Sequence, residues 1–433
     1  MRIFRIAVLL LVATRAVEAQ SLDVALKPFV FPFAATDSSA RALDPLLHAV
    51  RDARIIGLGE PTHGTAEVFR LKHQVIRRLV ESGHVRHLVL EASVGEGADF
   101  DDYVAGRRDD LEVLLGNLPL WMFKATDFAE LLRWLRAYNR TATTPVRVYG
   151  MEAQYADRSA RHALAYLNSV DPALASRLRM AFGAARVATD TASASDFAHL
   201  YAPLSDSTYA AYQSLFLGLR AAFDQRQPEF VKATSAVAFA AARRHVTAIG
   251  QFTSLALLEH SRARAQLRDY VMAINAAGIV ASAGADERVV VWGHNEHFGK
   301  REGNGGYDVL GRQLDRWYGP AYYVIGFDFG AGAYRAPGPD SWVHEVGAPT
   351  PGSFTAALAQ AGSPDLFLDI RAALGTASGA DALRGPFTVR ATAGGQLPMR
   401  DGVRMVDQSL TLDDRFDGLL FVSRSTPSVL LRR

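Results

Sequence analysis

Polar side chains follow four separate apolar runs of this chain, at points where predicted strands end. Glu60 and His63 follow residues 55–59, Glu91 follows residues 88–90, Glu152 follows residues 146–150, and His294 follows residues 289–293. In a mostly parallel α/β sheet, ligands bind outside the carboxyl ends of the strands. The four endings therefore predict one site built from distant segments, whose chemistry is acid–base catalysis or metal binding.

The sharpest local motif is Gly-Leu-Gly-Glu-Pro-Thr-His-Gly at residues 57–64. Its glycines permit a tight turn at the strand end, and Pro61 restricts the backbone further. A carboxylate beside a neutral histidine fixes the histidine tautomer and stabilises the imidazolium that forms on proton uptake. Glu60 and His63 therefore suit a general base that activates water.

A second motif, His294-Asn295-Glu296-His297, follows the strand predicted at residues 288–293. If this segment turns helical, its two histidines share one face. Histidines and glutamates at an open site could also bind a metal, so a metal-dependent hydrolase is an alternative hypothesis. A non-catalytic extracellular binding protein that has kept the pocket is a third.

The elements that position these residues have the pattern of an α/β protein. Buried strands are predicted at residues 53–58, 87–90, 146–150, 288–293, 322–327 and 418–422, and helices at 65–82 and 118–140. The alternation of strands and helices over residues 40–155 predicts a mostly parallel central sheet flanked by helices, with right-handed crossovers.

Residues 156–283 break this alternation, because they read as a run of helices without a strand. Ala- and Arg-rich stretches such as 236–247 and 261–277 have helical composition. Since the strand pattern resumes at Arg288, we expect a large helical insertion that covers the site and returns to the sheet. The α/β domain would then span residues 20–433.

The first 19 residues have the pattern of a secretory signal peptide. Arg2 and Arg5 precede an apolar stretch at residues 6–13, and Val17-Glu18-Ala19 offers small residues for cleavage. No later segment reaches the roughly 18 uninterrupted apolar residues of a membrane span. We therefore expect export to the periplasm or the extracellular space, without stable membrane insertion.

Charge and motif content exclude several classes of function. Residues 1–19 contain three arginines and one glutamate, so their removal takes 47 basic and 45 acidic residues to 44 of each, which gives no support to a nucleic-acid partner. The chain has no cysteine, which excludes thiolate metal ligands and a cysteine nucleophile. It also lacks Gly-x-Ser-x-Gly, a phosphate-binding loop and His-Glu-x-x-His.

Several motifs, taken in order, resemble the erythromycin esterase family. They are Gly-Glu-Pro-Thr-His-Gly, Leu90-Glu91-Ala92, Arg268-Asp269 with Met272 and Asn275, Trp292-Gly293-His294-Asn295-x-His297, and Tyr323-x-Ile325-Gly326. The similarity extends from about residue 40 to Phe421. This resemblance implies hydrolysis of a macrolide lactone without a metal or another cofactor, which is an antibiotic-resistance activity.

The resemblance also implies roles for individual residues. His63 matches the family's proposed general base, and Glu60 matches its carboxylate partner. Further matches are a second functional acid at Glu91, a histidine pair at His294 and His297, and an arginine at Arg268 that supports the carboxylates or polarises the substrate.

Two residues depart from the pattern of macrolide-active relatives. Lys72 stands where an arginine is common, and a lysine cannot reproduce a guanidinium fork. Glu152 stands where a shorter aspartate is usual. We therefore expect an exported hydrolase that cleaves a small-molecule ester or lactone, with macrolides among the candidates; the sequence does not predict its oligomeric state.

Overall fold

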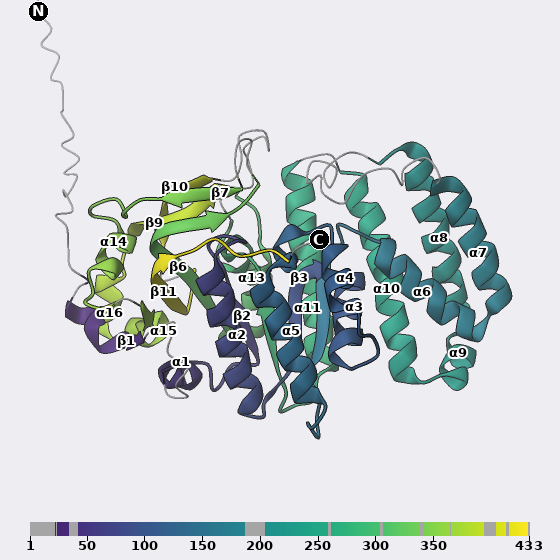
Figure 1. Ribbon diagram of the computed structural model, residues 1–433, viewed down its shortest axis with the longest axis horizontal. Helices are drawn as coiled ribbons and strands as arrows, with labels where there is room; N and C mark the ends of the chain where they lie inside the picture. Colours follow the sequence, from purple (N-terminus) through teal and green to yellow (C-terminus); the bar gives the residue numbers. More distant parts are fainter. Residues whose placement is uncertain are drawn as a thin grey trace, which may run out of the picture.

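A nine-stranded sheet with helices on its faces lies beside a group of helices in the computed structural model (Figure 1). The structure describes residues 22, 24–33, 42–186, 204–258, 261–303, 306–337, 342–363, 365–393, 404–412 and 415–431. The predicted signal peptide lies outside these residues. Across the described part of the chain, no helix is long and apolar enough to cross a membrane.

The sheet has the strand order β1-β8-β11-β6-β2-β5-β3-β4, with β7 paired to β6. Six neighbouring strands are parallel: β11 (Gly418–Ser425), β6 (Tyr322–Arg335), β2 (Ile55–Leu58), β5 (Arg288–Trp292), β3 (Val85–Ser93) and β4 (Arg147–Glu152). β7 (Val343–Val346) and β8 (Asp365–Leu368) run antiparallel to these six, and β1 (Val30–Phe33) pairs antiparallel with β8. A separate hairpin consists of β9 (Pro386–Ala393) and β10 (Arg404–Thr411). The predicted fold class is confirmed.

The position of β5 in the sheet brings the predicted site together. Although β5 follows β4 in the chain, it lies between β2 and β3. Leu58 is in register with Trp292, and Trp292 is in register with Leu90. The polar residues that follow these three positions therefore lie close together at one edge of the sheet, because they come from adjacent strands.

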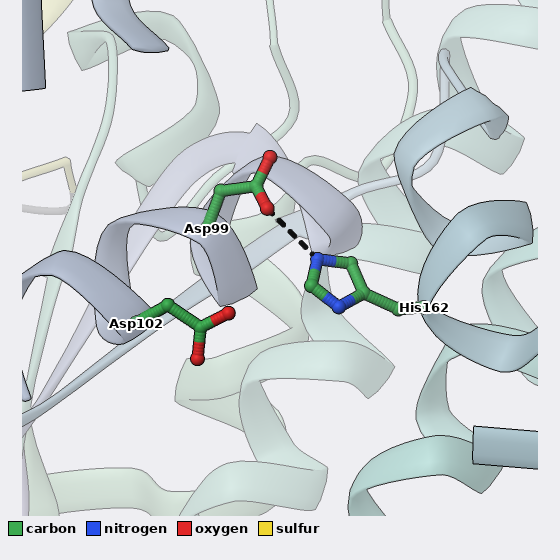
Figure 2. A group of neighbouring side chains, drawn as sticks. All are labelled: Asp99, Asp102 and His162. Atoms are coloured by element: carbon green, nitrogen blue, oxygen red, sulfur yellow. Dashed lines mark hydrogen bonds and ion pairs between the residues drawn. The ribbon is translucent and has the colours of Figure 1, made fainter. Parts of the chain in front are cut away.

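Five helices between β4 and β5 pack mainly on one another, around an apolar core of their own. They are α6 (Asp157–Val170), α7 (Pro172–Arg186), α8 (Asp206–Gln225), α9 (Gln227–Ala233) and α10 (Ala236–Ala256). The next helix, α11 (Arg262–Ser282), returns to the sheet and packs on β4 and β5. Asp99 of α3 (Val94–Val104) bonds His162 of α6, which ties this group to a helix that packs on β4 (Figure 2).

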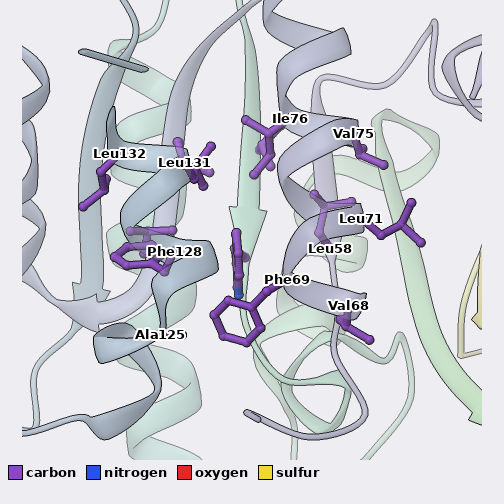
Figure 3. Packing of buried hydrophobic residues seen from close by; sticks show 14 of the residues in the cluster. Leu58, Val68, Phe69, Leu71, Val75, Ile76, Ala125, Phe128, Leu131 and Leu132 are labelled. Atoms are coloured by element: carbon purple, nitrogen blue, oxygen red, sulfur yellow. The ribbon is translucent and has the colours of Figure 1, made fainter. Parts of the chain in front are cut away.

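Both faces of the parallel strands are buried, as such sheets require. One face places Leu58, Leu90 and Trp292 against α2 (Ala66–Glu81) and α5 (Thr126–Asn139). Figure 3 shows Phe69 of α2 and Phe128 of α5 on this face; their rings lie 5.2 and 6.0 Å from the ring of Trp292. The other face packs against α11 and α13 (Leu310–Tyr318).

Shorter helices complete the body. They are α1 (Asp44–Ala49), α4 (Leu111–Gly116), α12 (Asn295–Phe298), α14 (Phe354–Ala359), α15 (Ile370–Leu374), α16 (Ala377–Ala382) and the 3₁₀ turns η1 (Val24–Phe29), η2 (Trp121–Lys124) and η4 (Gly319–Ala321). The single helical region predicted at 118–140 is therefore divided into η2 and α5. The division falls at Ala125, which is extended because it pairs with Leu430.

Close packing of α3 against β4 depends on a glycine. A Cβ atom on Gly97 would lie 1.8 Å from the backbone nitrogen of Gly150. We predict that Gly97→Ala lowers the free energy of unfolding by at least about 2 kcal/mol, because backbone must move to admit the methyl group. Gly116→Ala is the matched control, since a Cβ there meets nothing within 4 Å. Urea denaturation of both variants measures the difference, and equal stabilities would contradict this account of the α3–β4 contact.

Candidate active site

Glu60 is a buried carboxylate that three side chains from different elements hold. His63 Nδ1 lies 2.6 Å from its Oε1. Lys72 Nζ and Trp292 Nε1 donate to its Oε2 at 2.6 and 2.9 Å. Burial alone would raise the pKa of Glu60, but Lys72 and His63 outweigh burial and lower that pKa below its ordinary value. Glu60 is therefore an ionised hydrogen-bond acceptor.

His63 lies in the loop between β2 and α2, and its side chain is 30% exposed. Because a carboxylate only accepts hydrogen bonds, Nδ1 of His63 carries the proton that Glu60 receives. The lone pair of the ring is then on Nε2. The ring of His294 lies 4.9 Å away, centroid to centroid. A partly exposed histidine oriented by a buried carboxylate has the arrangement of a general base.

Lys72 is fully buried in α2 and stands behind Glu60. Its Nζ atom also lies 4.4 Å from the ring centroid of Trp292 and 5.7 Å from that of Phe327. Burial lowers the pKa of Lys72 to about 8, against the opposing effect of Glu60. The compact ammonium group thus fits between an acceptor and two aromatic rings.

Arg268 of α11 joins the two remaining glutamates. Its Nη2 atom donates to Glu91 Oε1 at 2.7 Å, and its Nε atom donates to Oε2 of Glu152. Glu152 is fully buried and also accepts from the side chain of Gln154 and the backbone of Ala153. Arg268 therefore fastens the last helix of the insertion to the ends of β3 and β4.

His297 extends this second group toward α11. Its Nδ1 lies 2.8 Å from Asp269 Oδ1, and its Nε2 lies 3.3 Å from Glu91 Oε1. Nε2 also lies 2.8 Å from Nη1 of Arg268, whose positive charge opposes protonation of the His297 ring. Burial also opposes protonation, but the Asp269 and Glu91 carboxylates prevail and raise the pKa of His297 to about 10. Glu91 in turn has a pKa well below its ordinary value, because His297 and Arg268 outweigh its burial.

His294 lies between the two groups. Its backbone nitrogen donates to Glu91 Oε2 at 2.8 Å, and its Nδ1 accepts from the backbone nitrogen of Glu296 at 3.3 Å. The proton is then on Nε2, which lies 3.3 Å from the carbonyl oxygen of Pro61. Burial lowers the pKa of His294 to about 3, so its ring is a neutral donor.

All eight residues predicted from the sequence therefore lie in two connected groups. The first contains Glu60, His63 and Lys72, and the second contains Glu91, Glu152, Arg268 and His297, with His294 between them. Sequence reasoning did not assign site roles to Trp292 and Asp269. Trp292 directly precedes Gly293-His294, and Asp269 directly follows Arg268. These neighbouring positions were the sequence signal that could have assigned both residues to the site.

The described residues contain one group of three histidine and carboxylate side chains with ligand atoms within 4.8 Å of one another. It is Asp99, Asp102 and His162 (Figure 2), apart from the two groups above. Asp99 also pairs with Arg158 and with Arg108. These cations occupy the space beside the carboxylate, so the group is an ion-pair junction between α3 and α6. At the candidate site, the glutamates and His297 are engaged in the hydrogen bonds and ion pairs described above.

The fold and the site define an α/β protein with a histidine–carboxylate centre at the carboxyl edge of its sheet. The chain belongs to the erythromycin esterase family, because the family model described as erythromycin esterase matches residues 80–425. Erythromycin esterase type II of Escherichia coli is 26% identical over 108 residues, so the match spans only 25% of this chain and 25% of that relative.

Three solved structures share the fold over nearly the whole chain. A Bacillus cereus protein has a TM-score of 0.77 at 24% identity, covering 94% of this chain and 98% of its own. A succinoglycan biosynthesis protein has a TM-score of 0.75 at 18% identity, and the match covers 93% of this chain and 96% of that protein. A mutant of the erythromycin esterase EreC in its open conformation has a TM-score of 0.65 at 16% identity, and the match covers 92% of this chain and 97% of that protein. These identities establish the fold alone.

The raised pKa of His297 predicts a pH-dependent stability. Its protonation contributes stability that is fully present below its ordinary pKa of 6.5 and is lost as pH rises toward about 10. We therefore expect His297→Gln to flatten the decline in the free energy of unfolding over this range. Urea denaturation at several pH values measures it, with the exposed His84→Gln as control. Parallel curves for wild type and His297→Gln would contradict the prediction.

Proposed function

We propose that this protein hydrolyses an ester or lactone with water that His63 activates and Glu60 orients. The observation that carries the proposal is the 2.6 Å contact between His63 Nδ1 and Glu60 Oε1. The carboxylate is fixed from behind by the buried Lys72 and the Trp292 indole. This arrangement leaves the Nε2 atom of a partly exposed ring to accept a proton.

The proposed reaction begins when Nε2 of His63 takes a proton from water as the water oxygen attacks the carbonyl carbon. The ionised Glu60 stabilises the imidazolium that results. Collapse of the tetrahedral intermediate breaks the bond between the acyl carbon and the ester oxygen. The imidazolium returns its proton to the departing alkoxide, which yields a carboxylic acid and an alcohol, or a hydroxy acid from a lactone.

His294 is the proposed donor to the developing oxyanion, toward which its Nε2–H group would turn from the long 3.3 Å contact with the carbonyl oxygen of Pro61. Its pKa of about 3 keeps the ring neutral, so it offers an N–H group and does not act as an imidazolium acid. Arg268 is instead engaged by Glu91, Glu152 and His297. Of its two roles weighed from the sequence, support of the carboxylates therefore agrees better with the geometry than polarisation of the substrate.

Macrolide lactones enter this proposal as one candidate substrate class. They are supported by the family and by the partial similarity to erythromycin esterase type II. Export of the protein is also a proposal, supported by the signal-peptide pattern of residues 1–19. The test is incubation of the purified protein with a 14-membered macrolide, other lactones and simple esters, with and without chelator, followed by mass analysis. Gain of one water without chelator sensitivity would support the proposal; metal-dependent turnover would overturn its mechanism.

Loss of the general base gives the most direct prediction. We expect His63→Ala to lower kcat/KM by roughly 10²–10⁴-fold on any substrate that the wild type cleaves, because proton removal from water loses its acceptor. The exposed His84→Ala, in the loop after α2, should leave kcat/KM unchanged. Near-normal turnover by His63→Ala would show that another group is the base.

The buried lysine predicts an alkaline limit to activity. Because the pKa of Lys72 is about 8, the cation that holds Glu60 is lost as pH rises through this value. We expect kcat/KM to fall above about pH 8 in the wild type. In Lys72→Arg this decline should disappear, since a guanidinium stays charged throughout the range. Full pH–rate profiles of both proteins measure the effect, with thermal unfolding to confirm that the larger side chain is accommodated; identical declines would exclude Lys72 as their source.

A further inference from the structure

Residues Thr426–Leu431, which follow β11, cross the starts of two helices that flank the candidate site. Thr65 pairs with Pro427, and Ala125 pairs with Leu430, in two antiparallel bridges. The first bridge lies directly before α2 and the second directly before α5. We call Thr426–Leu431 the crossing segment.

The crossing segment supplies hydrogen-bond acceptors that the two helices lack. The first N–H groups of a helix have no partner within the helix. The N-cap residues Thr65 and Ala125 make no side-chain capping bond. Instead, Ala66 N donates to the carbonyl oxygen of Thr426 at 2.9 Å, and Thr126 N donates to that of Val429 at 2.8 Å. Backbone carbonyls thus act where a serine or an aspartate would usually cap a helix.

The crossing segment also fixes the carbonyl group of Gly64, the residue that follows His63. The carbonyl oxygen of Gly64 accepts from Ser428 N and from Arg335 N, both at 2.9 Å. Arg335 Nε donates to the carbonyl oxygen of Ser428 at 2.7 Å, which closes a ring of contacts. Gly64 cannot be replaced there, because a Cβ atom would lie 1.9 Å from the carbonyl oxygen of Arg335. Ser428 is fully buried.

A charged contact anchors the beginning of the crossing segment. Glu67, in the first turn of α2, accepts from the backbone nitrogen of Thr426 at 2.6 Å and from its hydroxyl at 2.7 Å. Glu67 also accepts from Arg70 Nη2 at 2.7 Å. The helix that contains Lys72 and the loop that contains His63 are therefore both attached to this one segment.

We propose that the crossing segment is a positioning element for the general base. Its contacts with Gly64 and Ala66 hold the backbone on the C-terminal side of His63, so that the ring meets Glu60 in productive geometry. This inference rests on the proposed function of His63. A displacement of about 1 Å can lower a rate about 100-fold, so the contacts of a distant segment can decide turnover.

Two variants of the full-length chain test the proposal. Ser428→Pro removes the N–H group that donates to Gly64, because proline has no backbone donor. Glu67→Ala removes the anchor at Thr426 without entering the core, and Arg70→Ala is its matched control. We expect kcat to fall about 10–100-fold in both test variants, with KM within about twofold of wild type. Arg70→Ala should retain wild-type kcat.

A second readout follows the His63 ring itself. In NMR spectra of protein with labelled histidines, the His63→Ala variant identifies the His63 signals among the 12 histidines. We expect these signals to shift in Ser428→Pro and Glu67→Ala, and amide exchange at Ala66 to accelerate. If Ser428→Pro does not fold, Glu67→Ala decides alone. Unchanged kcat and unchanged His63 signals in a folded variant would overturn the proposal.

The NMR readout separates this inference from the proposed function. A wild-type protein that cleaves no ester would overturn the proposed function. The ring signals and the exchange rates would still show whether the crossing segment holds the loop. A fall in kcat with unmoved His63 signals would count against positioning, because the segment would then act on turnover by another route.

Discussion

The buried charge of Glu60 is the constraint on which the site depends. Removing a carboxylate from water costs several kcal/mol unless cations and hydrogen-bond donors replace the solvent. Here the replacements come from a loop, from α2 and from β5, as His63, Lys72 and Trp292. Each must arrive within hydrogen-bond distance of one carboxylate. The positions of β5 beside β2 and of α2 on the sheet are therefore conditions for a stable site.

In the second charged group, the buried carboxylates of Glu91 and Glu152 are likewise compensated by a cation, here from a more distant part of the chain. Glu91 and Glu152 end two neighbouring strands, and Arg268 reaches both from α11, the helix in which the insertion returns to the sheet. The helices before α11 have a separate apolar core, so the arginine lies where two packing units meet. His294 connects this group to the first one through its backbone bond to Glu91 and its ring contact with His63.

Lys72 shows why a departure from a family pattern needs the structure for its interpretation. From sequence alone, replacing an arginine with a lysine suggests the loss of a guanidinium fork. In the fold, the single ammonium group donates to Glu60 and lies over the ring of Trp292. A point charge fits this role because Glu60 receives its other hydrogen bonds from His63 and Trp292. The family match begins at residue 80, after Glu60, His63 and Lys72 but before Trp292.

The sequence by itself determined the elements and the ends from which the site is built. Apolar runs located β2, β3, β4 and β5, and the polar residues after them were the ones brought together, because buried strands and strand ends leave a local pattern. Tertiary structure decided that β5 lies between β2 and β3, and which cation pairs with which carboxylate. It also decided that Thr426–Leu431 caps two helices whose own N-cap residues make no capping bond. Local periodicity reports only that a segment is buried, whereas these pairings depend on which distant segments can pack against each other.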